Sequence, residues 1–275
     1  MKKNIYILPF DHRSSFIKDI LKIKGEPTAS DLKLIKDLKK IIFEGFLLAS
    51  QDFNKKDLAI LVDEKFGSDI IKQAHQKNIT LCIPVEKSGQ SFAFEYGKNF
   101  RTHIKNNKAN FVKILVRYDY RKDNKNQLKK IKTLYDFCKK NKFDLLLELL
   151  TPNFSNKFYF TQKAVEEILS YKIFPCIWKI EGYEKKSDWD KVIKSIKIYQ
   201  KNPKIIMLGR GESLLLIKKW IKSAKGFKEI IGFAVGRTIF LEAISDFYKN
   251  KITRDEAIKK IASRYLNIIN LWVKL

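Results

Sequence analysis

Short runs of apolar, β-prone residues recur along the whole chain, and longer stretches with apolar residues at helical spacing separate them. Each run is nearly continuous in hydrophobicity, a pattern typical of parallel strands that are buried on both faces. The pattern predicts strands over residues 5–10, 58–62, 79–84, 111–115, 144–149, 176–180, 204–208 and 230–235.

The intervening stretches predict amphipathic helices. Residues 31–50 place apolar side chains on one helical face and follow Ser30, which we interpret as the N-cap. Near the end of the chain, Thr253 and Glu256 have the spacing of a capping box and predict a closing helix. Further helices are expected at about 67–77, 125–141, 161–171, 187–201, 212–224 and 237–249.

Eight strands that alternate with helices over 275 residues predict a (β/α)8 TIM barrel, an α/β fold whose usual length is about 250 residues. We expect residues 1–275 to form a single domain, because no Pro-, Gly- or Ser-rich linker divides the chain. A doubly wound open sheet is the alternative. It is disfavoured because no Gly-rich GxGxxG motif follows the first predicted strand.

The charge balance raises the question of a nucleic-acid partner. Lysine and arginine total 56 against 30 acidic residues, a formal net charge of +26. A basic chain of this kind can bind nucleic acid, but the lysines are spread along almost every predicted helix and no RNA- or DNA-binding motif is visible. We therefore expect a solvated, lysine-rich surface with no specific nucleic-acid partner, which attracts anionic substrates as a side effect.

Several classes of protein are disfavoured by what the sequence lacks. The sequence contains no run of eighteen apolar residues, so no membrane span is predicted. The apolar run near the start is too short for a secretory signal. We therefore expect a cytoplasmic protein. Cys82, Cys138 and Cys176 stand far apart without CxxC spacing. Neither a disulfide framework nor a zinc site is therefore expected.

Charged side chains lie inside three of the apolar runs: Lys113 in FVKILV, Glu148 in LLLELL and Lys179 in IWKIEG. A charge in a buried strand is costly unless it is paired. A Lys–Glu ion pair that merely fills the barrel would meet that requirement. Three charges on neighbouring strands are harder to explain as filling, so we interpret them as a candidate site.

Further polar residues stand where the predicted strands end. In a TIM barrel, catalytic and binding side chains come from the C-terminal ends of the strands. The candidates there are Asp11 and Arg13 after the first strand, Asp63 after the second, Arg117 after the fourth, and Arg210 and Arg237 after the last two.

Two glycine-arginine turns follow the seventh and eighth predicted strands, the usual phosphate position of this barrel. Gly209, Gly211 and Gly236 would let backbone N–H groups approach an anion closely, and the following helix would point its positive end at it. Arg210 and Arg237 could add bidentate hydrogen bonds. The alternative is that the glycines only permit tight turns. Because the pattern occurs twice, we favour a phosphate site.

Lys179 has surroundings that suit a nucleophile. A lysine amine attacks a carbonyl only when it is unprotonated, and a nearby cation such as Lys113 with partial desolvation favours the neutral amine. Glu148 could then carry protons, and Asp11 could take the hydroxyl proton whose loss starts C–C cleavage. These are the components of a Schiff-base aldolase.

The motifs ILPFDHRSSF, LVDEKFG, VKILVRYD, LLELLTP, WKIEG, LGRGES and GFAVGRTIFLEA together resemble a bacterial aldolase-like domain of myo-inositol catabolism. That domain occurs alone or fused behind the kinase 5-dehydro-2-deoxygluconokinase, and the resemblance spans nearly the whole chain. The kinase half is missing here, so kinase activity is not implied. The domain is in turn similar to class I tagatose-bisphosphate and fructose-bisphosphate aldolases.

The resemblance implies roles for individual residues. Lys179 matches the Schiff-base lysine of those aldolases, Lys113 their second lysine, Glu148 their strand-5 glutamate and Asp11 the aspartate that closes strand 1. Their phosphate loops match Gly209-Arg210 and Gly236-Arg237. In fructose-bisphosphate aldolases a second acid follows the glutamate by two positions, where this chain has Leu150, so proton transfer or the substrate differs.

The resemblance also implies a reaction: cleavage of 2-deoxy-5-keto-gluconate 6-phosphate to dihydroxyacetone phosphate and malonate semialdehyde, without metal or organic cofactor. A different phosphorylated ketose, or a sugar-phosphate-binding regulatory domain that has lost catalysis, are the alternatives. A nucleic-acid-binding protein is motivated by charge alone. We expect a phosphorylated sugar as partner and no membrane, and a homo-oligomer is left open.

Overall fold

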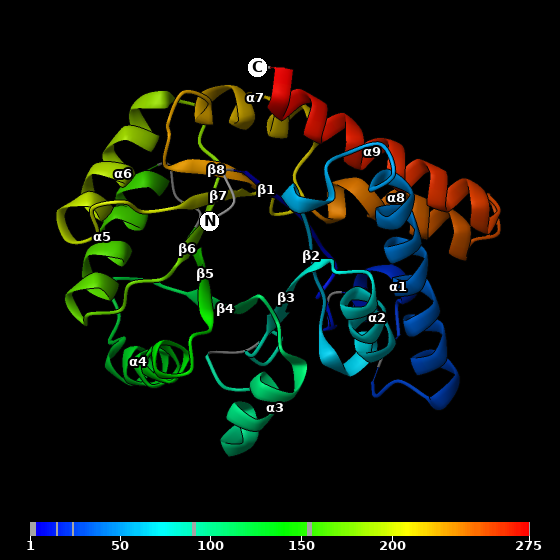
Figure 1. Ribbon diagram of the computed structural model, residues 1–275, viewed down its shortest axis with the longest axis horizontal. Helices are drawn as coiled ribbons and strands as arrows, with labels where there is room; N and C mark the ends of the chain where they lie inside the picture. The colour runs from blue at the N-terminus through cyan, green and yellow to red at the C-terminus, as the bar shows by residue number, and fades with distance from the viewer. Residues whose placement is uncertain (1–3, 15, 24, 90–91, 153–155, 275) are drawn as a thin grey trace. The chain divides into compact units, whose positions relative to one another are not determined.

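In the computed structural model the eight strands form one closed barrel in which the order in space is the order in sequence. The neighbouring strand pairs are parallel, as in β1–β2 and β4–β5 (Figure 1). The strands are β1 (Ile5–Pro9), β2 (Leu58–Leu61), β3 (Thr80–Pro84), β4 (Phe111–Arg117), β5 (Asp144–Leu150), β6 (Ile177–Glu181), β7 (Ile205–Leu208) and β8 (Ile230–Ala234). The predicted TIM barrel is confirmed.

The helices follow the predicted order, with additions. They are α1 (Ala29–Ala49), α2 (Glu64–Gln76), α3 (Phe100–Asn107), α4 (Lys125–Lys140), α5 (Lys157–Ser170), α6 (Lys186–Tyr199), α7 (Leu214–Ala224), α8 (Arg237–Tyr248) and α9 (Arg254–Lys274). The sequence pattern did not predict α3, whose buried residues are only Phe100 and Ile104. It also missed the π-helix Phe16–Leu21.

The helix caps explain one difference from the prediction. The N-cap of α1 is Thr28 rather than Ser30, because Thr28 Oγ1 accepts from Asp31 N while Asp31 Oδ2 accepts from Thr28 N. This reciprocal pair satisfies two donors that the helix itself leaves unpaired. The predicted capping box before α9 is confirmed, with Thr253 N donating to Glu256 Oε2 at 2.7 Å and Glu256 N to Thr253 Oγ1 at 3.3 Å.

The chain groups into two compact units. The first comprises residues 1–83, 209–214 and 233–275, and the second comprises 84–208 and 215–232. The structure describes residues 4–14, 16–23, 25–89, 92–152 and 156–274. That residues 1–275 act as one domain stays a prediction.

In the first unit, α9 packs closely on α1 (Figure 1). A Cβ atom on Gly45 of α1 would lie only 2.6 Å from Ile261 Cγ2, so the two helices approach within the space that glycine leaves. Arg254 at the start of α9 pairs with Glu44 at 2.8 Å and Asp37 at 2.9 Å, both on α1. The buried hydroxyl of Tyr265 donates to Tyr6 O at 2.6 Å, which ties α9 to β1.

In the second unit, alternation along β6 puts Trp178 and Lys179 on opposite faces of the sheet. Trp178 is fully buried and its Nε1 donates to Gln200 Oε1, just past α6, at 3.1 Å. Successive side chains of a strand point to opposite faces, so Lys179 lies on the other face of the sheet. The register pairs Glu148 of β5 with Lys179 of β6, which brings the two side chains to the same level.

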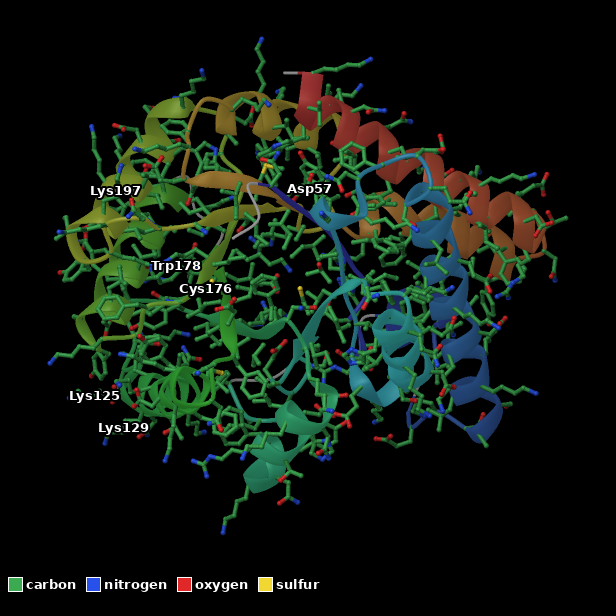
Figure 2. All side chains as sticks on the ribbon, viewed as in Figure 1. Asp57, Lys125, Lys129, Cys176, Trp178 and Lys197 are labelled. Atoms are coloured by element: carbon green, nitrogen blue, oxygen red, sulfur yellow. The ribbon has the colours of Figure 1, made fainter. Side chains whose placement is uncertain are left out.

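Three labelled lysines on the helices of this unit lie on the side away from the strands. Figure 2 shows Lys125 and Lys129 on α4 and Lys197 on α6 at the outer side of the ribbon. Lys197 pairs with Glu229 at 2.6 Å. Among the described residues, no helix is long and apolar enough to cross a membrane.

Candidate active site

One carboxylate joins the two lysines that the sequence singled out. Glu148 Oε2 lies 2.9 Å from Lys179 Nζ and 3.0 Å from Lys113 Nζ. The three side chains come from the neighbouring strands β4, β5 and β6 and are at least 90% buried. The structure therefore brings Lys113, Glu148 and Lys179 together, as their places in three apolar strands predict.

Glu86 is a fourth member that the sequence reading missed. Its Oε1 accepts from Lys113 Nζ at 2.7 Å, and the residue is 6% exposed. It follows β3, where Val85 N donates to Lys113 O at 3.0 Å and Glu86 bridges to Phe94. An apolar strand ending in Val85-Glu86 repeats the strand-end pattern of the other candidates, which is the signal that could have found it.

The four side chains balance in charge, with two lysines and two glutamates. Buried charges persist when their partners and geometry are good, and removing one partner of such a group leaves an uncompensated charge. The bridging carboxylate of Glu148 contacts two amines with one oxygen. It can accept a proton from one amine while the other remains an ammonium, which is the chemistry of a proton carrier between two lysines.

A second ion pair follows on the same face of β6. Glu181, two residues after Lys179, is buried, and its Oε1 accepts from Lys157 Nζ at 2.8 Å. Lys157 is the first residue of α5, and its ammonium also lies 4.8 Å from the centre of the Trp220 ring. The face that carries Lys179 thus continues with a charged, paired side chain.

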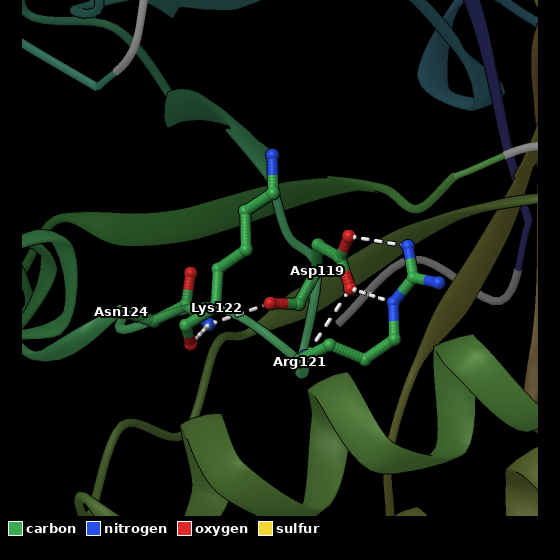
Figure 3. A network of polar contacts seen from close by, with 4 residues as sticks. All are labelled: Asp119, Arg121, Lys122 and Asn124. Atoms are coloured by element: carbon green, nitrogen blue, oxygen red, sulfur yellow. Dashed lines mark hydrogen bonds and ion pairs between the residues drawn. The ribbon is translucent and has the colours of Figure 1, made fainter.

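The connection after β4 holds a compact polar network (Figure 3). Arg121 binds the Asp119 carboxylate with two nitrogens, Nε at 2.9 Å and Nη2 at 2.7 Å, and these hydrogen bonds lower the pKa of Asp119 to about 2. Asn124 Nδ2 donates to the carbonyls of Asp119 and Lys122. Arg117, which we predicted to bind substrate, is exposed at the end of β4.

In the first unit, Asp63 is held by structural contacts. It is 1% exposed, its Oδ1 pairs with Lys39 Nζ, and its Oδ2 accepts from Phe66 N at 2.9 Å, capping α2. Both oxygens therefore have a partner within the fold. Arg13 is buried and Asp11 half-buried. Substrate binding by Asp63 and Arg13 stays a prediction.

The two glycine-arginine turns contact each other. Arg210 and Gly211 have left-handed backbones, with φ of 51° and 84°, and Arg237 Nη2 donates to Arg210 O. A Cβ on Gly211 would meet Arg237 Cζ at 2.8 Å, so the guanidinium lies against the glycine backbone. Gly209 N donates to Ala234 O at 3.1 Å, which joins the start of the turn to β8.

Gly236 has a separate requirement. A Cβ there would meet Pro9 O at 2.2 Å, so β1 and the start of α8 approach too closely for a larger residue.

A cavity of about 350 Å³ lies beside the turns. Its polar lining includes Glu212, Ser213, Arg237, Thr238 and Arg264. Within the described ranges, no group of three or more His, Cys, Asp or Glu side chains is placed to hold a metal ion.

The chain belongs to the family described as "Uncharacterized protein conserved in bacteria (DUF2090)", which matches residues 1–275. That description assigns no activity. No curated protein matches the sequence.

Among solved structures, the fold is similar to that of archaeal fructose 1,6-bisphosphate aldolases. One has a TM-score of 0.60 and 13% identity, over 99% of this chain and 95% of that chain. Another, in which the catalytic Lys is covalently bound to the carbinolamine intermediate of the substrate, has a TM-score of 0.57 and 13% identity, over 97% and 94% of the two chains. Identities this low establish a likeness of fold.

Proposed function

We propose that this member of the DUF2090 family is a class I aldolase whose Lys179 forms a Schiff base with a phosphorylated keto sugar. The observation that carries the proposal is the position of Glu148 Oε2 between the amines of Lys179 and Lys113. A Schiff-base lysine needs a proton acceptor in contact and a neighbouring positive charge that disfavours a second ammonium. The likeness to an archaeal aldolase with a covalently bound catalytic Lys supports the proposal.

The first half of the reaction uses the four-residue cluster. Glu148 takes a proton from Lys179, and the neutral amine adds to the substrate ketone to give a carbinolamine. Glu148 returns a proton to the carbinolamine hydroxyl, which leaves as water, and an iminium forms on Lys179. Lys113 stays an ammonium between Glu86 and Glu148 and compensates their charge through both steps. The iminium withdraws electrons itself, so we propose that no metal or organic cofactor takes part.

The second half breaks the carbon–carbon bond. We assign Asp11 as the base that removes the proton of the substrate hydroxyl on the carbon that becomes the aldehyde. The C–C bond then breaks, its electron pair moves into the iminium to give an enamine, and the aldehyde leaves. Protonation of the enamine and hydrolysis release the ketone product and the Lys179 amine. Fructose-bisphosphate aldolases have a second acid at the position of Leu150. We propose that Glu86, which accepts a hydrogen bond from Lys113, takes part in proton transfer in its place.

The proposed substrate is 2-deoxy-5-keto-gluconate 6-phosphate, following the resemblance to the aldolase-like domain of myo-inositol catabolism. The imine would form at the keto carbon, and cleavage would give malonate semialdehyde and dihydroxyacetone phosphate. We assign binding of the phosphate to the turns at Gly209-Arg210-Gly211 and Gly236-Arg237, from which Gly211 and Arg237 line a cavity. The reaction fits a cytoplasmic sugar-acid breakdown route, which we propose as its setting.

The test is release of triose phosphate from that substrate and from a panel of phosphorylated ketoses. Wild type should turn over at least one, and Lys179→Arg, which keeps a positive charge but lacks the free amine, should not. Arg237→Ala should weaken substrate binding by about 1.5–3 kcal/mol, the range for hydrogen bonds to charged groups. If the wild-type protein binds sugar phosphates but cleaves none of them, a regulatory domain is favoured over an aldolase.

A further inference from the structure

The ion pair between Lys157 and Glu181 is a largely buried charged pair that the proposed reaction does not use. Glu181 follows Lys179 by two residues on β6, so the two side chains leave the same face of the sheet about 6.6 Å apart along the strand. Glu181 Oε1 accepts from Lys157 Nζ at 2.8 Å. Replacing a buried ion pair by apolar side chains is often neutral or stabilising, so stability alone does not account for a charged pair beside Lys179.

The ammonium of Lys157 is held in place from three sides. Besides its contact with Glu181, it lies 4.8 Å from the centre of the Trp220 ring and 5.6 Å from that of Tyr183. Gly182 lets the Trp220 ring come close to the end of β6, because a Cβ on Gly182 would lie only 2.2 Å from Trp220 Cδ2. The lysine that begins α5 therefore has a fixed position near the end of β6.

The same ammonium has donors that Glu181 does not use. A lysine ammonium carries three N–H donors. Within the part of the chain that the structure describes, Lys157 donates to Glu181, and its other contacts are the two ring faces. The lysine is also the more accessible partner, with a side chain 15% exposed against 5% for Glu181. A further acceptor can therefore reach Lys157 while Glu181 stays covered.

Lys113 shows what such an ammonium holds in this fold. It contacts two carboxylates, Glu86 at 2.7 Å and Glu148 at 3.0 Å. Lys157 contacts one carboxylate, that of Glu181, and by the same pattern a second carboxylate can arrive with a ligand. A carboxylate that leaves water needs a cationic partner, and hydrogen bonds between charged groups are about twice as strong as neutral ones.

We infer that Lys157 binds the carboxylate of a keto sugar acid, at the end of the substrate that leaves as the aldehyde. The inference rests on the proposed function in that it takes the imine to form on Lys179. In the proposed substrate the carboxyl carbon lies four bonds from the keto carbon, which is about 5 Å along an extended chain. That length is close to the spacing of Lys179 and Glu181 along β6. Lys157 thus selects keto sugar acids over ketoses with a hydroxyl at this end.

The test uses 2-deoxygluconate 6-phosphate, which has a hydroxyl in place of the ketone and forms no imine, and the amide of its carboxyl group. Calorimetry measures the affinity of the full-length protein for both. Wild type should bind the acid more tightly than the amide. Lys157→Met should lose about tenfold to a hundredfold in affinity for the acid, the range for hydrogen bonds to charged groups, and little for the amide. Lys157→Arg keeps the charge and should retain most of the preference.

Lys163→Met is the matched control. Lys163 lies on the same helix, pairs with Glu166 at 3.1 Å and lies 5.6 Å from the centre of the Tyr159 ring, but it is more exposed. Its variant should bind acid and amide as wild type does. If Lys157→Met fails to fold, Glu181→Gln tests the inference alone, because it removes the competing carboxylate and should increase the preference for the acid. A wild-type ratio of acid to amide affinity in those of the Lys157 and Glu181 variants that fold would overturn the inference.

Borohydride labelling separates this inference from the proposed function. Dihydroxyacetone phosphate lacks the carboxylate end, so it should label Lys179 in Lys157→Met as in wild type. Loss of the acid preference in Lys157→Met, without any labelling of wild type, would support the Lys157 assignment and contradict the aldolase. Labelling of Lys179 in a wild-type protein that binds acid and amide equally would support the aldolase and overturn the Lys157 assignment.

Discussion

Lys113 balances the charge of both glutamates in the cluster of Glu86, Lys113, Glu148 and Lys179. Its ammonium contacts Glu86 at 2.7 Å and Glu148 at 3.0 Å, so Lys113→Met leaves two buried carboxylates with Lys179 as their remaining partner in this group. We expect the free energy of unfolding to fall by about 3–5 kcal/mol, the usual cost of breaking a buried ion pair. We also expect slower imine formation on Lys179, because excess negative charge favours its ammonium.

Denaturant unfolding and the rate of borohydride labelling measure the two effects. Glu86→Gln is the matched control, because it keeps a hydrogen-bond acceptor beside Lys113 and removes one negative charge. It should slow labelling less than Lys113→Met. Labelling of Lys113 in place of Lys179 in the wild-type protein would show that Lys113 forms the imine and that Lys179 is the neighbouring ammonium.

At the scale of residues, the charged side chains inside apolar strands could be predicted as site residues from the sequence. The residues outside the strands that form ion pairs with buried charges could not. Lys113, Glu148 and Lys179 interrupt apolar runs, which marks them in the sequence. Glu86 lies at the edge of a polar stretch, and only the pairing of Val85 with β4 brings it to Lys113. Lys39 looks like its neighbours in DLKK, but it falls four residues after Ile35 and three before Ile42, on the apolar face of α1.

At the scale of elements, the turn after β7 depends on Gly211. Its φ of 84° would cost an alanine about 1–2 kcal/mol, and a Cβ there would also push on the Arg237 guanidinium at 2.8 Å. Gly211→Ala should therefore destabilise the protein and displace Arg237 from Arg210 O. Gly226→Ala is the control, because its φ of 95° is similar and the nearest atom to a Cβ is Lys186 Nζ at 4.0 Å.

Unfolding by urea and binding of sugar phosphates distinguish the two variants. Both should lose stability from the backbone, but only Gly211→Ala should weaken phosphate binding. Equal affinity of the two variants for sugar phosphates would show that the turn after β7 does not bind the phosphate.

Element boundaries were predictable to within a few residues because buried parallel strands and amphipathic helices have different periods. The eight strands lie where continuous apolar runs predict them, and β4 and β5 extend two and one residues further than predicted because Arg117 and Leu150 continue their pairing. The helix α3 was not predictable, because a polar segment with two buried residues has too weak a periodicity.

At the scale of the molecule, the net charge of +26 predicts weak and salt-sensitive contact with nucleic acids. Nucleic-acid binding that comes only from neutralised phosphates loses affinity steeply as the salt concentration rises, because the release of condensed counterions into concentrated salt gives less entropy. DNA or RNA should bind weakly at 50 mM salt and detach by about 200 mM. Filter binding or fluorescence anisotropy measures this, and tight, sequence-selective binding that persists at physiological salt would show a nucleic-acid function.

The measurement that tests the proposed aldolase activity most directly is reductive trapping of an imine on Lys179. Dihydroxyacetone phosphate, or a ketose phosphate that the enzyme turns over, is added with borohydride, and the digested protein is analysed by mass spectrometry. We predict irreversible loss of activity and a gain of the reduced ligand's mass on the peptide that contains Lys179, with no labelling in Lys179→Arg. Failure to label any lysine across a broad panel of keto-sugar phosphates would contradict the proposal.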